Sequence, residues 1–130
     1  GLALSDGVFG ARPQLLIGDL NALCPDDYDA ARWAEITAQR ARNRWEPPRG
    51  DTVAALARAG YVDCWRRAGC EGPVATCRFE TRVDYIWADP ALLERWSLSR
   101  CRRLDRDRFA SDHRPVAASF QIAALGQRAR

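Results

Sequence analysis

Residues 82–88 read RVDYIWA, and this stretch carries the clearest strand pattern in the chain. Val83, Tyr85 and Trp87 alternate with Asp84, which gives the two-residue period of a β-strand. Aspartate is unusual in such a strand, because it has poor strand propensity and a buried carboxylate is costly without a partner. The stretch therefore predicts a strand whose carboxylate has either a structural or a functional partner.

Further strand and helix patterns lie on both sides of this stretch. Apolar runs and alternation predict additional strands over residues 14–18, 98–104 and 115–122. Helical spacing predicts helices over residues 28–43, 51–59 and 90–96. Asp26 and Asp27 can cap the first of these helices. The elements together predict an α/β fold with one mixed sheet of about four strands and helices on one face.

The predicted strands carry apolar residues on both faces, as Val83 and Ile86 illustrate. A single layer of helices cannot cover both faces of such a sheet. We therefore expect the sheet to need a second layer that this chain does not contain.

Composition indicates one globular domain over residues 1–130. Hydrophobic residues make up 47% and charged residues 28% of the chain, which is too apolar for disorder. No apolar run is long enough to predict a membrane span. The chain begins at Gly1 and contains no methionine, so we expect a trimmed or partial product.

The five cysteines are scattered and form no close pair of the kind that binds zinc. Reduced thiols are expected, which favours an intracellular location, although localisation is otherwise unknown. A Cys70–Cys77 disulfide across a glycine-bearing turn remains an alternative.

All 20 basic side chains are arginine, and the net charge is +3. A GC-rich genome would explain the arginines through codon usage alone. Guanidinium groups also suit phosphate oxygens, so the charge is compatible with an anionic substrate without requiring one.

Asp19 and Asn21 lie two residues apart at the end of the first predicted strand, where their side chains point the same way. A carboxylate there can orient or deprotonate a water, and an amide can stabilise a phosphorane-like oxygen. Alternatively, both residues simply begin a turn, which both residue types favour.

His113 is the only histidine, and it directly follows Asp112. An orienting carboxylate would fix the tautomer of its ring and raise its basicity. Asp84 is the natural candidate, which leaves Asp112 free to face a cation or water. The alternatives are a salt bridge from Asp84 to Arg82, a surface histidine, and Arg114 as either a phosphate clamp or a surface charge.

Three segments that occur in order resemble motifs of the endonuclease/exonuclease/phosphatase superfamily, which includes deoxyribonuclease I and the abasic-site endonucleases. They are Gly18-Asp19-Leu20-Asn21, Arg82-Val83-Asp84-Tyr85-Ile86 and Ser111-Asp112-His113-Arg114-Pro115-Val116. The resemblance covers residues 14–122 and corresponds to the second half of that domain. It implies half of a four-layered α/β/β/α sandwich and hydrolysis of a phosphoric ester with Mg²⁺ or Mn²⁺.

The resemblance also implies roles for individual residues. Asp19 would position or activate water, Asn21 would hold the scissile phosphate, and Asp84 would orient His113. His113 would contact the phosphate or accept a proton, and Asp112 would lie near the metal.

Only about thirteen residues precede the predicted strand that ends in the first motif, whereas family members have a whole first half there with a metal-binding glutamate. A hard divalent cation needs several oxygen ligands, so we expect little activity from the chain without that half. The expected partners are a phosphate-ester substrate and either the missing half or a second copy of the chain at the uncovered sheet face.

Two other function classes remain open. One is a non-catalytic half-domain that acts as a protein-interaction module. The other is a nucleic-acid-binding module, which is less favoured because arginines alternate with acids, as in residues 105–108. The substrate could be DNA, RNA, a lipid phosphate or a nucleotide.

Overall fold

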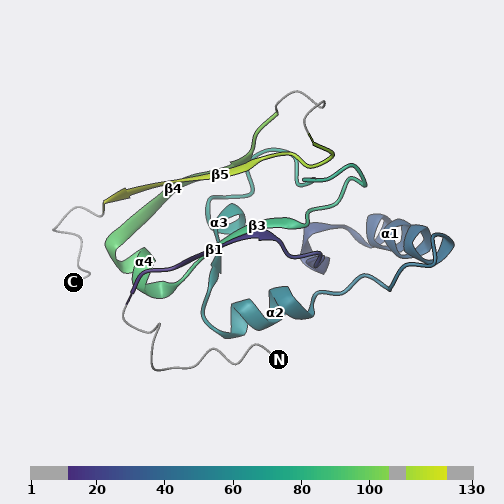
Figure 1. Cartoon of the computed structure of the whole chain (residues 1–130), viewed down its shortest axis with the longest axis horizontal. Helices are drawn as coiled ribbons and strands as arrows, with labels where there is room; N and C mark the ends of the chain where they lie inside the picture. Colours follow the sequence, from purple (N-terminus) through teal and green to yellow (C-terminus); the bar gives the residue numbers. More distant parts are fainter. Residues whose placement is uncertain (1–11, 106–110, 123–130) are drawn as a thin grey trace.

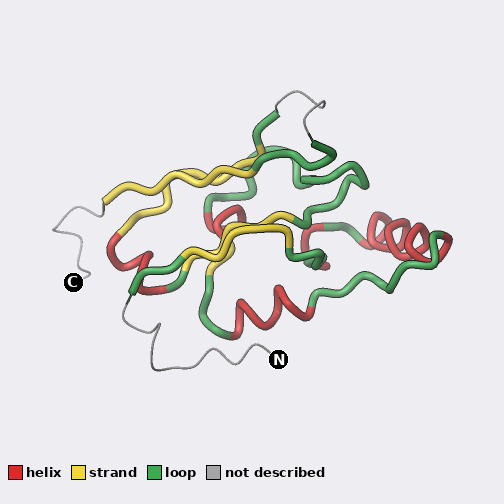
Figure 2. The backbone as a smooth tube through the Cα atoms, viewed as in Figure 1, coloured by secondary structure: helices red, strands yellow, loops and turns green. Residues whose placement is uncertain are grey.

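The computed structural model of the chain describes residues 12–105 and 111–122. Its strands are β1 (Leu15–Asp19), β2 (Val62–Asp63), β3 (Asp84–Ala88), β4 (Trp96–Arg103) and β5 (Val116–Ile122). Its helices are a short 3-10 helix η1 (Pro25–Asp27), α1 (Ala30–Arg42), α2 (Asp51–Arg58), α3 (Cys64–Arg67) and α4 (Pro90–Arg95). Figure 1 and Figure 2 show their arrangement, which is a mixed α/β fold.

The predicted helices and longer strands are present, with ends that move by a few residues. Helix α1 begins at Ala30 because the Asp29 side chain accepts a hydrogen bond from the Arg32 amide at 2.7 Å. Asp26 and Asp27, the predicted caps, lie in η1 instead. The nearer aspartate therefore caps α1.

The strands form two antiparallel sheets, and the prediction of one mixed sheet is wrong. One sheet has the order β1-β3-β2, and the other consists of β4 and β5. Every pairing among the described strands is antiparallel. The alternation of apolar residues identifies a strand but does not determine its partner, and for that reason the pairing could not be predicted.

The two faces of β3 contact different layers. Tyr85 and Trp87 pack with Val53 and Leu56 of α2 in one buried cluster. On the other face, β3 packs against α3, α4 and the β4–β5 sheet through a second buried cluster, whose members include Ile86, Ala88, Leu92 and Cys101. The three-stranded sheet thus lies between α2 and the β4–β5 sheet, as Figure 1 shows.

The chain therefore supplies part of the second layer that the sequence was expected to lack. The apolar side chains of the two sheets are still incompletely covered at one strand of each sheet. Ile17 of β1 is 64% exposed, and Ile122 of β5 is 75% exposed. Within the described residues, each of these strands pairs on one side only. An apolar face thus remains partly open along β1 and β5.

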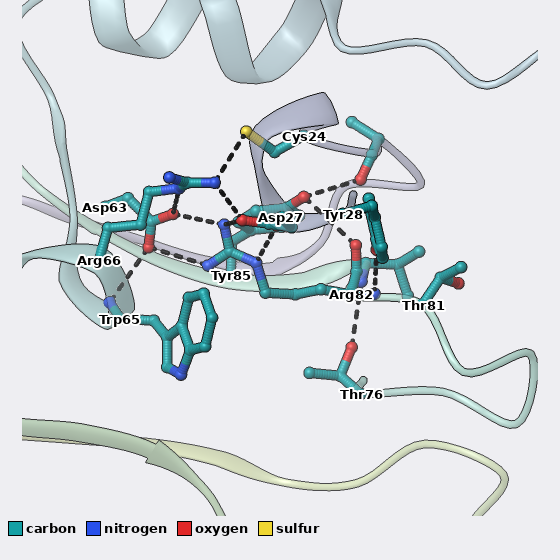
Figure 3. Close-up of polar contacts among 12 residues, drawn as sticks. Cys24, Asp27, Tyr28, Asp63, Trp65, Arg66, Thr76, Thr81, Arg82 and Tyr85 are labelled. Atoms are coloured by element: carbon teal, nitrogen blue, oxygen red, sulfur yellow. Dashed lines mark hydrogen bonds and ion pairs between the residues drawn. The ribbon is translucent and has the colours of Figure 1, made fainter. Parts of the chain in front are cut away.

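A buried charge network anchors the start of β3 (Figure 3). The Arg82 guanidinium donates to Asp27 Oδ2 at 2.8 Å and to Asp63 Oδ2 at 2.6 Å. Arg66 also forms an ion pair with Asp27, and the ring of Trp65 lies beneath the Arg82 guanidinium, 4.8 Å away. Because both acids are paired with Arg82, the predicted alternative of an Arg82–Asp84 salt bridge is wrong.

The five cysteines are all free thiols, so the alternative of a Cys70–Cys77 disulfide is also wrong. In the part of the chain that the structure describes, no helix combines the length and apolar character needed to cross a membrane. Most of the charged segment 105–108 lies outside the described residues.

Candidate functional site

The register of β1 and β3 brings two of the predicted site residues together. Asp19 pairs with Asp84 directly across the antiparallel ladder. Residues opposite one another in such a ladder project their side chains to the same face of the sheet. The two carboxylates therefore lie side by side, and like charges in this arrangement repel unless a cation or proton lies between them.

His113 joins this pair. Its Nδ1 lies 2.9 Å from Asp84 Oδ2, which is hydrogen-bond distance. The carboxylate hydrogen bond raises the pKa of His113 above its usual value, an effect that partial desolvation opposes and the charge of Asp19 reinforces. In the part of the chain that the structure describes, Nε2 of His113 has no hydrogen-bonding partner and remains available to a ligand.

Thr76 holds Asp84 and His113 next to one another, and sequence reasoning did not identify it. Its buried hydroxyl accepts hydrogen bonds from the amides of Val83 and Asp84, both at 3.1 Å. Its carbonyl accepts from the Arg114 amide at 2.7 Å. One residue thus links the start of β3 to the segment that carries His113. Nothing in the sequence marks this threonine, because it lies in an irregular segment without periodicity.

The backbone around Asn21 has a conformation that side chains rarely adopt. Asn21 has φ of 47°, in the left-handed region that asparagine tolerates better than most residues, and Gly18 has φ of 149°. The Asp19 carboxylate stabilises the turn by accepting a hydrogen bond from the Asn21 amide at 2.8 Å. The turn interpretation of these residues is therefore confirmed, and their functional interpretation stays a prediction. The turn leaves the Asn21 side-chain amide without a hydrogen-bonding partner among residues 12–105 and 111–122.

Asp112 and Arg114 lie outside this group. The Asp112 carboxylate lies 3.5 Å from Arg78 Nε, and both side chains are largely exposed. Arg114 lies 3.7 Å from the Glu80 carboxylate. The family resemblance implies a position near a metal for Asp112, and in the structure its carboxylate lies beside the Arg78 guanidinium.

Three of the site residues could hold a metal ion. Asp19, Asp84 and His113 each offer one ligand atom, and these atoms all lie within 4.8 Å of one another. Mg²⁺ and Mn²⁺ take oxygen ligands from carboxylates and retain several waters. Two carboxylates side by side fit such a cation, but they supply only part of its coordination shell.

Two surface hollows border His113. One, of about 290 Å³, lies along Ile17, Asp84 and Pro115 and is mostly apolar. The other, of about 260 Å³, includes Asn21 and extends toward the end of α1. His113 thus lines both hollows, and Asp84 lines the first of them.

Comparisons of the chain with protein-family models, with curated proteins and with solved structures find no match. The function proposed below therefore depends on the geometry of Asp19, Asp84 and His113.

Proposed function

We propose that the chain is the C-terminal part of a divalent-metal-dependent phosphoric ester hydrolase of the endonuclease/exonuclease/phosphatase type. The observation that carries this proposal is the convergence of Asp19, Asp84 and His113 from three separate segments. Each of these segments carries one of the three sequence motifs. Motifs that resemble one family and also share one site are the strongest support for a shared chemistry.

The fold is compatible with the same proposal. The order α2, the β1-β3-β2 sheet and the β4–β5 sheet supports an assignment as part of a four-layered α/β/β/α sandwich. Among the described residues β1 and β5 are edge strands, so further strands could pair with them and extend the two sheets.

The proposed hydrolysis would use the site residues in the positions that they occupy in the structure. Asp84 fixes the orientation of the His113 ring through Nδ1, which leaves Nε2 to contact the phosphate or exchange a proton with it. Asp19 would orient the attacking water, and the free amide of Asn21 would hold a phosphate oxygen. These roles require an ionised Asp19 and a hydrogen-bonded Asp84.

Mg²⁺ or Mn²⁺ would be held by Asp19 and Asp84, with the remaining positions taken by water and by groups outside this trio. A bound cation would neutralise the developing charge on the phosphate oxygens. Asp112 would contribute only after its carboxylate leaves Arg78. Because the chain supplies a partial shell, we expect weak metal binding and negligible cleavage by the chain alone.

Mn²⁺ titration of the ¹⁵N-labelled chain followed by NMR tests the proposal. Paramagnetic broadening should begin at Asp19, Asp84 and His113, and Asp19→Asn should abolish it. Asp26→Asn is the matched control, because Asp26 is exposed and belongs to η1. Broadening that begins elsewhere, or that persists unchanged in Asp19→Asn, would contradict the metal site and with it the hydrolase proposal.

A second candidate is the non-catalytic interaction module, which the exposed apolar edges favour. Leu15 and Ile17 of β1 are 41% and 64% exposed, and Ile122 of β5 is 75% exposed. Large exposed apolar side chains along strands are often covered by a partner when they form a patch. Size-exclusion chromatography tests this candidate: a concentration-dependent dimer that Ile17→Gln disrupts supports it, and a monomer without dye-accessible apolar surface contradicts it.

A further inference from the structure

A second binding feature lies beside the candidate active site, at the end of α1. The hollow of about 260 Å³ that includes Asn21 and His113 is bordered on its far side by Trp45 and Phe79. The two rings meet edge to face with their centroids 5.0 Å apart. The hollow therefore runs from the groups that would hold a phosphate to a pair of aromatic rings.

The position of Trp45 is fixed by the backbone rather than by burial. Its amide donates to the Arg40 carbonyl at 2.9 Å, and the preceding Arg44 has φ of 56°. The Arg40 guanidinium lies 5.9 Å from the Trp45 ring centroid, and its Nε donates to the Glu46 carbonyl at 2.5 Å. The backbone hydrogen bond and the Arg40 side chain thus hold Trp45 in place. This residue is still 42% exposed, so part of the ring is open to a ligand.

Backbone strain gathers around this hollow. Four residues other than glycine have positive φ, among those that the structure describes, and three of them are Asn21, Arg44 and Glu80. Asn21 lines the hollow, Arg44 precedes Trp45, and Glu80 follows Phe79. Strained residues persist where the surrounding structure imposes them, and they cluster at binding and catalytic sites.

The lining also offers polar groups that would recognise the edge of a ring. Gln39 of α1 lines the hollow, and within the described parts of the chain nothing hydrogen-bonds to its side-chain amide. An amide has both donors and an acceptor, so it suits a planar group with polar atoms on its edge. Aromatic faces that stack on such a group, with a nearby arginine, are the usual means by which proteins hold an unpaired base.

We infer that this hollow binds a planar aromatic group of nucleobase type, attached to the phosphate that Asn21 and His113 would contact. The inference rests on the proposed hydrolase function and narrows its substrate to a base-bearing phosphate ester. Trp45 supplies the stacking face, Phe79 packs against the Trp45 ring, and Gln39 hydrogen-bonds to the polar edge of the base.

Ligand titrations with Mg²⁺ present, followed by NMR, test this subsite without requiring turnover. The probes are the nucleoside 5′-monophosphates and ribose 5-phosphate, which has the same phosphate and no base. Stacking of one base contributes roughly 1–3 kcal/mol, so the best nucleotide should bind about 5- to 150-fold more tightly than ribose 5-phosphate. Trp45→Ala should remove this preference and leave ribose 5-phosphate binding unchanged, and Trp45→Phe should keep part of it.

Trp96→Ala is the matched control. Trp96 is 39% exposed, close to the value for Trp45, and it lies at the start of β4, outside the hollow. Its replacement should leave every affinity unchanged.

The outcomes separate the subsite from the function on which it rests. Equal affinity for nucleotides and ribose 5-phosphate would overturn the subsite and leave the hydrolase proposal standing. A nucleotide preference that Trp45→Ala does not change would likewise overturn the subsite, because the base would lie elsewhere. Absence of binding by any of the phosphates would contradict the hydrolase proposal and the subsite together.

Discussion

Replacement of Thr76 by valine tests the link that holds the candidate site together. Valine has nearly the shape of threonine, but it lacks the hydroxyl that accepts hydrogen bonds from the Val83 and Asp84 amides at 3.1 Å each. Thr76 is 2% exposed, so neither water nor a rotated side chain can easily replace that acceptor. The variant therefore leaves two backbone donors unsatisfied without creating a cavity.

The cost follows from the two donors. A buried donor left without a partner costs about 1–3 kcal/mol, so two donors set an upper range of about 2–6 kcal/mol. Asp84 is only partly buried and can recruit water, which limits its share. We expect Thr76→Val to lower the free energy of unfolding by about 2–4 kcal/mol.

Urea denaturation followed by tryptophan fluorescence measures this loss. Thr76→Ser keeps the hydroxyl and should lose only about 1 kcal/mol, for one methyl group. Thr37→Val is the exposed control, because the Thr37 hydroxyl bonds only to the Trp33 carbonyl on the surface of α1, and it should change stability by less than about 0.5 kcal/mol. A loss below about 1 kcal/mol in Thr76→Val would refute the reasoning, since the unsatisfied buried amide of Val83 alone should cost at least that much.

Thr76→Val should also change the pKa of His113 at the candidate site. His113 is the only histidine of the chain, so its ring signals in an NMR titration are unambiguous. When the Asp84 amide loses its acceptor, the carboxylate should move away from the ring and the pKa of His113 should fall toward its usual value. An unchanged pKa would mean that Thr76 supports the fold but does not position Asp84.

Three further predictions concern the pair, the buried network and the thiols. Asp84→Asn should lower the pKa of His113, because the carboxylate hydrogen bond that raises it is removed. Because the pKa of His113 is raised in the folded state, the Asp84–His113 pair stabilises the fold fully at pH values below the unfolded pKa of histidine, and this stabilisation is lost as pH rises through the folded pKa. The difference in free energy of unfolding between the parent chain and Asp84→Asn should therefore shrink across that pH range. A difference that stays constant with pH would contradict the Asp84–His113 pairing. Arg82→Met should cost about 3–5 kcal/mol in urea denaturation, because Asp63 loses its close guanidinium partner and Asp27 keeps only Arg66, and a loss under about 1 kcal/mol would show that the ion pairs of Arg82 contribute little to stability. A thiol reagent at pH 8 should label Cys70 first, since it alone of the five cysteines is exposed, and rapid labelling of a second thiol would contradict the packing.

The local elements of the fold could be predicted from the sequence, and their pairing could not. Periodicity located β3 and β5, and the helical spacing after Asp27 located α1, because these patterns depend on neighbouring residues. The division into two antiparallel sheets depends on which strands meet in space. That choice is made by packing on the two faces of β3, which no local pattern specifies.

The same division applies to the candidate site. Asp84 and His113 could be selected because a mid-strand aspartate and a single histidine are unusual in their local patterns, and Asp19 because its segment resembles a family motif. Thr76 could not be predicted, because its importance lies in two backbone amides that it reaches only in the folded state. The partners of Arg82 were missed for a related reason, since Asp27 and Asp63 lie far from it in the sequence.

The arrangement of Asp19 and Asp84 is difficult to explain by stability alone. Their positions opposite one another in the β1–β3 ladder place two carboxylates on one face, which destabilises a sheet. His113 hydrogen-bonds to only one of the two carboxylates, and among the described residues Asp19 forms no ion pair with an arginine, although the chain contains 20 basic residues. A sequence shaped only by folding would place an opposite or neutral side chain at one of these positions. A site that must hold a cation has a reason to keep both carboxylates, because the repulsion that weakens the empty sheet becomes attraction when a divalent ion lies between them.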